Sequence, residues 1–262
     1  MVVIGTLLII VGEIGRRNKP APQVALEVVI VAPEEQDILR ITKELIEQLN
    51  IRSFRPALVS WAEYVPSTMI DDPEKMFPEQ VGVPKREIPI GWCVFTWDRV
   101  FLPTEMKGKL DPEDWRPLLA SSLIYEEKLG IKRDLGLILL STPIIIDALG
   151  WWELLAVSIS TSSIPIVLLI IDIAGLIGAL ILIGFLVKRF SRRLRLTADT
   201  LAAKHVGRET FERVLEKMKT VGLIDPYAGV GWGSGNPFSP ELMKGRPTLA
   251  ERITNINQTS RD

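Results

Sequence analysis

The sequence predicts a mainly helical α+β protein that is embedded in a membrane by a helical hairpin. Apolar residues are concentrated between residues 135 and 187, where Asp147, Glu153 and Asp172 are the only charges. Short segments rich in β-branched residues precede this block, and segments with apolar residues at helical spacing lie on both sides of it. Basic residues flank both outer ends of the block, as they often do beside membrane spans.

The hairpin is predicted from two apolar segments. The stronger, residues 163–187, would form a helix about 37 Å long at about 1.5 Å per residue, which exceeds the roughly 30 Å hydrocarbon core of a bilayer. The weaker, residues 135–157, is separated from it by the plausible turn STSS at 160–163. The basic flanks place both outer ends in the cytoplasm. We therefore expect an integral protein of the cell membrane with most of the chain cytoplasmic.

Four parts follow along the chain. Residues 1–14 are a candidate N-terminal membrane segment, and residues 20–134 form an N-terminal cytoplasmic part. The transmembrane hairpin occupies 135–187, and residues 188–262 form a C-terminal cytoplasmic part. An even number of crossings puts the two cytoplasmic parts on the same side, so they can share one site.

The cytoplasmic parts contain candidate strands and helices. Strand character, from β-branched and aromatic residues, occurs at 24–32 and 90–103. Capping residues and apolar spacing predict helices over five segments, namely 33–51, 111–130, 191–207, 208–222 and 246–256.

Composition excludes several kinds of site. With one histidine, His205, the chain cannot supply a site that needs two imidazoles, and with one cysteine, Cys93, it cannot form an internal disulfide. Lys and Arg number 31 against 32 Asp and Glu, so no basic surplus supports a nucleic-acid partner.

Four motifs, in order along the chain, resemble a known family. They are CVFTWDRVFLP, LDPEDWRPLLASSLIYEEKLGIKRD, RLTADTLAAKHVG and RPTLAERITNI, with the apolar block between the second and third. In this order they are similar to the HtpX-like and CAAX-prenyl-protease family of integral membrane zinc metallopeptidases, over roughly residues 50–256. The resemblance implies a zincin-like (gluzincin) domain with the transmembrane hairpin inserted between the zinc helix and the ExxAD-like helix.

The resemblance also implies site positions. In that family two histidines of HExxH and a later glutamate bind zinc, the glutamate beside the first histidine is the general base, and an aspartate orients a ligand histidine. Aligned on GIKRD, Glu126 and Gly130 occupy the histidine positions and Glu127 the general-base position. Aligned on AD, Arg195 occupies the third ligand position and Asp199 keeps the aspartate.

The ligand positions therefore lack the donors that zinc needs. A catalytic zinc site normally has three protein ligands, but here one position is a glycine and another a cation. The histidine of the family's terminal HP element is replaced by Arg246. We expect no bound zinc, a vestigial Glu127, and Arg195 paired with Glu126, Glu127 or Asp199 in place of the metal.

The function expected from this is that of a catalytically inactive metallopeptidase homologue, a pseudoprotease acting as a binding, regulatory or scaffolding membrane subunit. One alternative is an active metalloendopeptidase whose metal site a partner chain completes around Glu126 and Glu127. Another is a membrane-anchored interaction protein unrelated to proteolysis. The expected partners are the lipid bilayer, a membrane protein or unfolded peptide, a second copy of the chain, or an active relative. Glycines at 175, 178 and 184 suit close helix packing.

Overall fold

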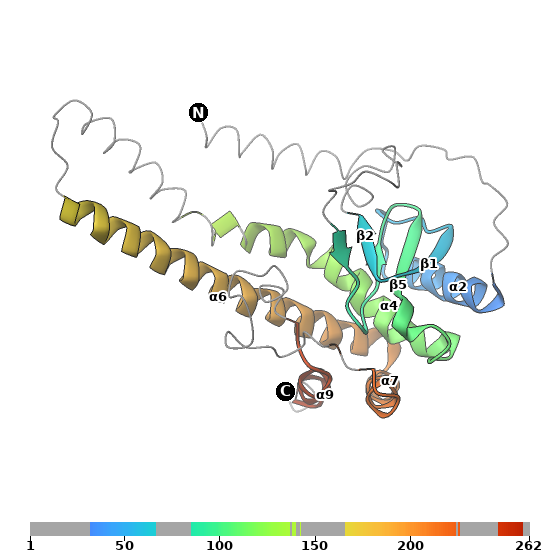
Figure 1. Ribbon diagram of the computed structural model, residues 1–262. Helices are drawn as coiled ribbons and strands as arrows, with labels where there is room; N and C mark the ends of the chain where they lie inside the picture. Colours follow the sequence, from blue (N-terminus) through green and yellow to red (C-terminus); the bar gives the residue numbers. More distant parts are fainter. Residues whose placement is uncertain are drawn as a thin grey trace.

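A computed structural model of the chain describes residues 32–66, 85–136, 138–139, 142, 166–223, 225 and 246–258. This part is mainly helical, with one three-stranded sheet and one two-stranded sheet (Figure 1). The candidate N-terminal membrane segment, the predicted strand before residue 32 and most of the segment 135–157 lie outside the described residues.

The three-stranded sheet has the order β1-β5-β4. Strand β1 (Leu58–Ala62) pairs in parallel with β5 (Arg99–Pro103), which pairs antiparallel with β4 (Val94–Phe95). The predicted strand 90–103 is therefore a tight hairpin rather than one strand. Strands β2 (Tyr64–Pro66) and β3 (Lys85–Glu87) form the separate antiparallel pair.

Helix α2 (Pro33–Gln48) confirms the helix predicted before β1. Proline occupies its first turn, where a missing N–H costs nothing, and two acidic residues there favour the positive end of the helix dipole. Its buried face, Ile38, Ile41 and Leu45, contacts β1 and α4.

The predicted helix 111–130 has three parts. A 3₁₀ turn, η2 (Pro112–Asp114), leads into α4 (Trp115–Leu123), which continues as the π-helical turn η3 (Ile124–Lys128). In that turn the N–H of Leu129 donates to the carbonyl of Ile124 at 3.0 Å, five residues earlier. A π turn rotates the side chains that follow it relative to an α-helix. Positions 126 and 130 therefore do not have the shared face that two residues four apart have on an α-helix.

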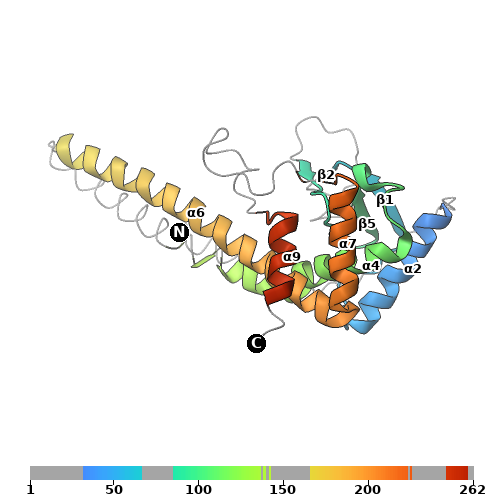
Figure 2. The same ribbon diagram turned by 90° about the horizontal axis from the view of Figure 1, so that it is seen from below.

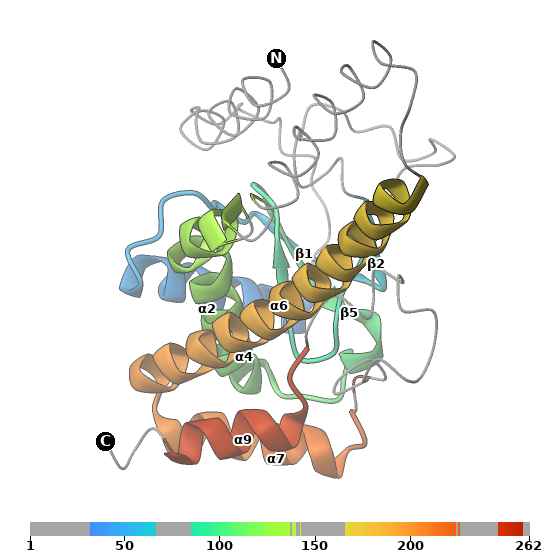
Figure 3. The same ribbon diagram turned by 90° about the vertical axis from the view of Figure 1, so that its left-hand side faces the viewer.

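Three of the described helices lie after residue 165. Helix α6 (Ile166–Val206) ends at Gly207, whose φ of 91° suits glycine. Helices α7 (Arg208–Thr220) and α9 (Leu249–Gln258) contact each other and α6, and they lie side by side (Figures 2 and 3). The first half of α6 extends away from the sheet (Figure 1).

The predicted transmembrane hairpin is wrong. No helix in the described ranges has an apolar run long enough to cross a membrane. The transmembrane hairpin, the membrane-embedded fold and the localisation as an integral membrane protein are thereby contradicted. Most of residues 163–187 form the first half of one helix, which continues through the basic flank into the packed region.

Candidate functional site: a buried arginine cluster

Asp199 lies on α6 with its carboxylate fully buried, and two neighbouring helices supply its hydrogen bonds. Arg252 of α9 donates from Nε to Oδ2 at 2.7 Å and from Nη2 to Oδ1 at 2.8 Å. Ser121 of α4 donates its hydroxyl to Oδ1 at 2.6 Å. A bidentate arginine and a third donor satisfy the carboxylate and offset the cost of burying its charge. Asp199 therefore joins α4, α6 and α9 at one point.

The rest of the Arg252 guanidinium is also occupied. Its Nη1 donates to the backbone carbonyl of Gly91 at 3.3 Å. Its Cζ lies 4.7 Å from the ring centroid of Trp92 and 5.9 Å from that of Phe211. Aromatic faces attract a cation, and more strongly where water is excluded. The guanidinium thus has polar partners at its edge and apolar partners on its faces.

Arg195 is buried one helical turn before Asp199 on the same helix. Its Cζ lies 4.5 Å from the centroid of Trp92 and 4.8 Å from that of Tyr125. Trp92 therefore contacts two guanidinium groups. We call Asp199, Arg252, Arg195 and Trp92 the buried arginine cluster.

The two glutamates of the π turn have separate partners. Glu126 accepts a hydrogen bond from Nη1 of Arg133 at 2.9 Å. Burial by itself lowers the pKa of Arg133, but the charge and hydrogen bond of Glu126, together with the charges of Tyr125 and Asp134, raise that pKa above its ordinary value. Glu127 accepts a hydrogen bond from the hydroxyl of Ser53 at 2.5 Å. Glu127 is thus tied to the loop before β1.

The remaining predicted positions lie elsewhere. Gly130 is buried directly after η3, and Arg246 donates from Nη1 to both carboxylate oxygens of Asp225, at 3.1 and 3.2 Å. His205, the single histidine, is exposed near the end of α6.

The predicted pairing of Arg195 with Glu126, Glu127 or Asp199 stays a prediction. Asp199 accepts hydrogen bonds from α9 and α4, and Glu127 accepts one from Ser53. The cluster also holds Arg195 against aromatic rings.

The residues at the ligand positions do not fit a zinc ion. Glu126 is already engaged by Arg133, Gly130 has no side chain, and Arg195 brings a positive charge that would repel the metal. Within the ranges that the structure describes, no three His, Cys, Asp or Glu side chains are grouped so as to hold a metal ion. The metallopeptidase chemistry that the resemblance implies therefore has no support in this site, and we derive no reaction step through a metal.

Sequence reasoning missed the most connected member of the cluster. Arg252 lies on an amphipathic helix between Leu249 and Ile256, at the three- and four-residue spacing of its apolar face. An arginine on the apolar face of a helix was the available signal, because a buried cation needs a buried anion.

Cys93 is buried beside the cluster, and its backbone N–H donates to the Ser122 hydroxyl at 2.9 Å. Burial raises the pKa of the Cys93 thiol to about 12, although a hydrogen bond from Ser122 and the charge of Arg252 oppose the rise. The folded protein therefore holds this thiol in its neutral, unreactive form.

The Cys93 thiol is expected to resist a disulfide reagent at neutral pH and to react only on unfolding. Its contribution to stability is fully present below the unfolded pKa of 9.0 and is lost as the pH rises toward about 12, because the unfolded thiol ionises first. Thiol titration with and without denaturant checks the first expectation. Urea unfolding across this pH range checks the second, and Cys93→Ala should remove that part of the pH dependence.

Gly91 is expected to tolerate no side chain. Its φ is 76°, and an added Cβ would lie 2.8 Å from Met218 Cε and 3.0 Å from Arg252 Nη1. Gly91→Ala should lower the free energy of unfolding by about 2 kcal/mol, from backbone strain and overpacking together. The matched control is Gly108→Ala, where φ is 69° and a Cβ meets nothing within 4 Å, so that only strain of about 1 kcal/mol is expected. Equal losses in the two variants, measured in urea, would show that the close contact at Gly91 is unimportant.

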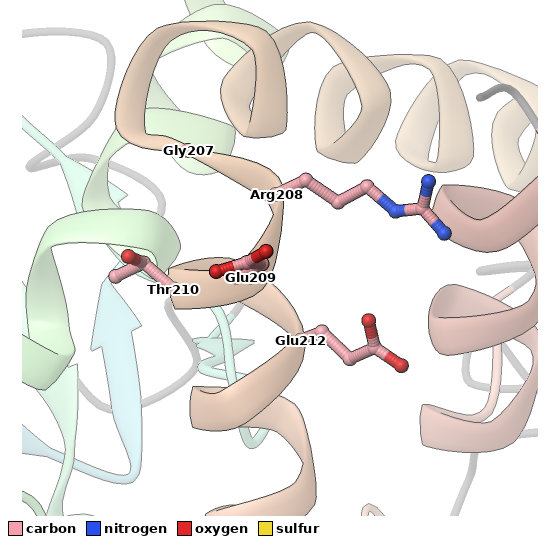
Figure 4. A pocket seen from close by; sticks show the side chains of 5 residues that line it. All are labelled: Gly207, Arg208, Glu209, Thr210 and Glu212. Atoms are coloured by element: carbon pink, nitrogen blue, oxygen red, sulfur yellow. The ribbon is translucent and has the colours of Figure 1, made fainter.

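An open hollow of about 550 Å³ lies at the start of α7, away from the cluster (Figure 4). Its lining consists of Gly207, Arg208, Glu209, Thr210 and Glu212. Arg208 and Glu212 extend toward α9, where Asn257 accepts from Arg208 at 2.6 Å and donates to Glu212 at 3.0 Å. These side chains hold α7 to α9, and none of the predicted site residues lines the hollow.

Comparison with protein-family models, with curated proteins and with solved structures finds no match for this chain.

Proposed function

We propose that this chain is a non-catalytic homologue of the HtpX-like metallopeptidases that acts as a binding or scaffolding protein. The observation that carries the proposal is the position of Arg195. At the place where the resemblance expects a metal-binding glutamate, a buried guanidinium lies 4.5 Å from Trp92. A cation held in this way would repel a divalent ion from the site.

The environment of Asp199 also supports the proposal. In the family that the motifs resemble, the matching aspartate orients a ligand histidine. Here the carboxylate accepts hydrogen bonds from Arg252 and Ser121, so it holds helices together. In this proposal Asp199 stabilises the packing of the helices, and the chain lacks the zinc ligands that hydrolysis in the resembled family requires.

The test uses the full purified chain, zinc and a labelled unfolded polypeptide such as reduced carboxymethylated lactalbumin. We expect less than stoichiometric zinc after equilibration, no cleavage that phenanthroline inhibits, and saturable binding of the intact polypeptide. Stoichiometric zinc with chelator-sensitive cleavage would overturn the non-catalytic assignment. Cleavage that disappears in Glu127→Gln would do so as well.

Binding is judged separately by fluorescence anisotropy of the labelled polypeptide. No saturable rise in anisotropy, with the protein folded, would reject the binding part of the proposal for unfolded chains. Competition by a short apolar peptide would support it.

A further inference from the structure

We propose that the exposed apolar face of α6 pairs with the same face of a second copy of this chain, as two antiparallel helices. The face is formed by Gly175, Gly178, Leu182 and Phe185, with Ile177 and Ile181 beside them; we call it the α6 stripe. The proposal does not rest on the function proposed above, because none of these residues belongs to the buried arginine cluster.

Large apolar side chains of the α6 stripe are unusually open. Leu182 is 57% exposed, Ile177 50%, Phe185 46% and Ile181 40%. At about 200 Å² for a fully exposed large side chain, these four present on the order of 400 Å² of apolar surface. A patch of that size is comparable to the largest apolar patch on an ordinary monomer, which is often a functional surface.

Part of α6 beyond the stripe is covered by the chain itself. Gly184 is buried, and a Cβ on Gly136 would lie 2.3 Å from the ring of Phe190, so the helical segment 130–136 packs against α6 near Phe190. The stripe is exposed at each of its positions whose exposure the structure describes.

The spacing of the stripe indicates a helix as that partner. Its positions 175, 178, 182 and 185 are separated by three, four and three residues, the spacing of helices that pack along a seam. Both glycines are exposed, and a Cβ added at either meets nothing within 4 Å. A neighbouring backbone can therefore approach closely at these two positions.

The same spacing is symmetric about residue 180. In an antiparallel pair centred there, Gly175 of one copy faces Phe185 of the other, and Gly178 faces Leu182. Each large side chain then packs over a glycine of the other helix, so that two large side chains do not compete for the same space. A parallel pair would place glycine against glycine and leave Leu182 and Phe185 each opposed by its own copy.

Charge favours the antiparallel arrangement too. Along α6, Asp172 precedes the stripe, and Lys188 and Arg189 follow it. Antiparallel pairing brings the basic end of one helix beside the acidic end of the other, and it also opposes the two helix dipoles. Parallel pairing would bring the basic ends together. The expected buried area, about 800 Å² from the large side chains of both copies, is smaller than that of stable specific interfaces and matches a weak, transient one. We therefore expect a dissociation constant in the micromolar range.

Cysteine cross-linking of the full chain tests the arrangement, since Cys93 is buried and unreactive. We expect a mixture of Gly178→Cys and Leu182→Cys chains to form several times more disulfide-linked dimer than either variant alone. The control, Thr197→Cys, is exposed on α6 outside the stripe and should give none. Cross-linking of each variant mainly with itself would overturn the antiparallel register.

Sedimentation equilibrium tests the pairing itself. Gly178→Leu should raise the dimer dissociation constant at least tenfold without lowering the thermal stability of the diluted monomer, because its Cβ meets nothing within the chain. Thr197→Leu should change neither. A chain that stays monomeric up to about 100 μM would overturn the proposal. Binding of the stripe to phosphatidylcholine vesicles without any chain–chain cross-link would also overturn it.

Discussion

Replacing Asp199 by asparagine is expected to lower the free energy of unfolding by about 3–5 kcal/mol, because it leaves the buried Arg252 guanidinium without its counter-charge. The substitution keeps the shape of the side chain and its ability to accept hydrogen bonds from Ser121. The loss therefore reports charge rather than packing. Urea unfolding at neutral pH measures it.

Two further variants separate the ion pair from its surroundings. Arg252→Met in the Asp199→Asn background removes the stranded charge, so it should recover a large part of the loss. A double variant as unstable as Asp199→Asn would show that the pair does not act as a unit. Arg40→Gln is the surface control: its partners Asp37 and Glu44 are themselves exposed, and no measurable change is expected.

Trp92→Ala is expected to cost about 3–5 kcal/mol as well, by a different route. Trp92 is buried, meets Tyr125 edge-on with ring centroids 5.9 Å apart, and contacts the guanidinium groups of Arg195 and Arg252. Its loss creates a cavity and removes the aromatic face from both cations. Denaturant unfolding measures the cost, and near-ultraviolet circular dichroism reports whether Tyr125 stays fixed.

The matched control is Trp97→Ala. Trp97 also has an arginine near its ring, Arg55 at 5.9 Å, but both lie nearer the surface. A much smaller cost is therefore expected. Trp92→Phe, which keeps an aromatic face in less volume, should recover part of the stability. Equal costs at the two tryptophans would show that the guanidinium contacts at Trp92 add nothing to ordinary packing.

Local patterns predicted several elements correctly. The apolar spacing and first-turn acids of α2, the amphipathic pattern of α7 and the end of α6 at Gly207 all depend on interactions within a few residues. Asp199, which the sequence singled out, lies at a buried contact between helices.

Other predictions failed where local pattern and tertiary context disagree. The π turn at Ile124–Lys128 changes the direction in which Glu126 and Glu127 face. The spacing of apolar and charged residues in the sequence does not indicate that this turn contains one residue more than a turn of α-helix. The prediction of a transmembrane hairpin failed because apolar composition does not show where a helix ends: α6 continues through the basic flank as a single helix.

By itself, the sequence determined what the chain can offer: helices where apolar residues recur at helical spacing, a single histidine, and no set of imidazoles for zinc. Only the tertiary structure decided which charges meet. Arg252 and Asp199 are 53 residues apart, and a buried cation selects the anion that folding brings within 3 Å, whatever their separation along the chain.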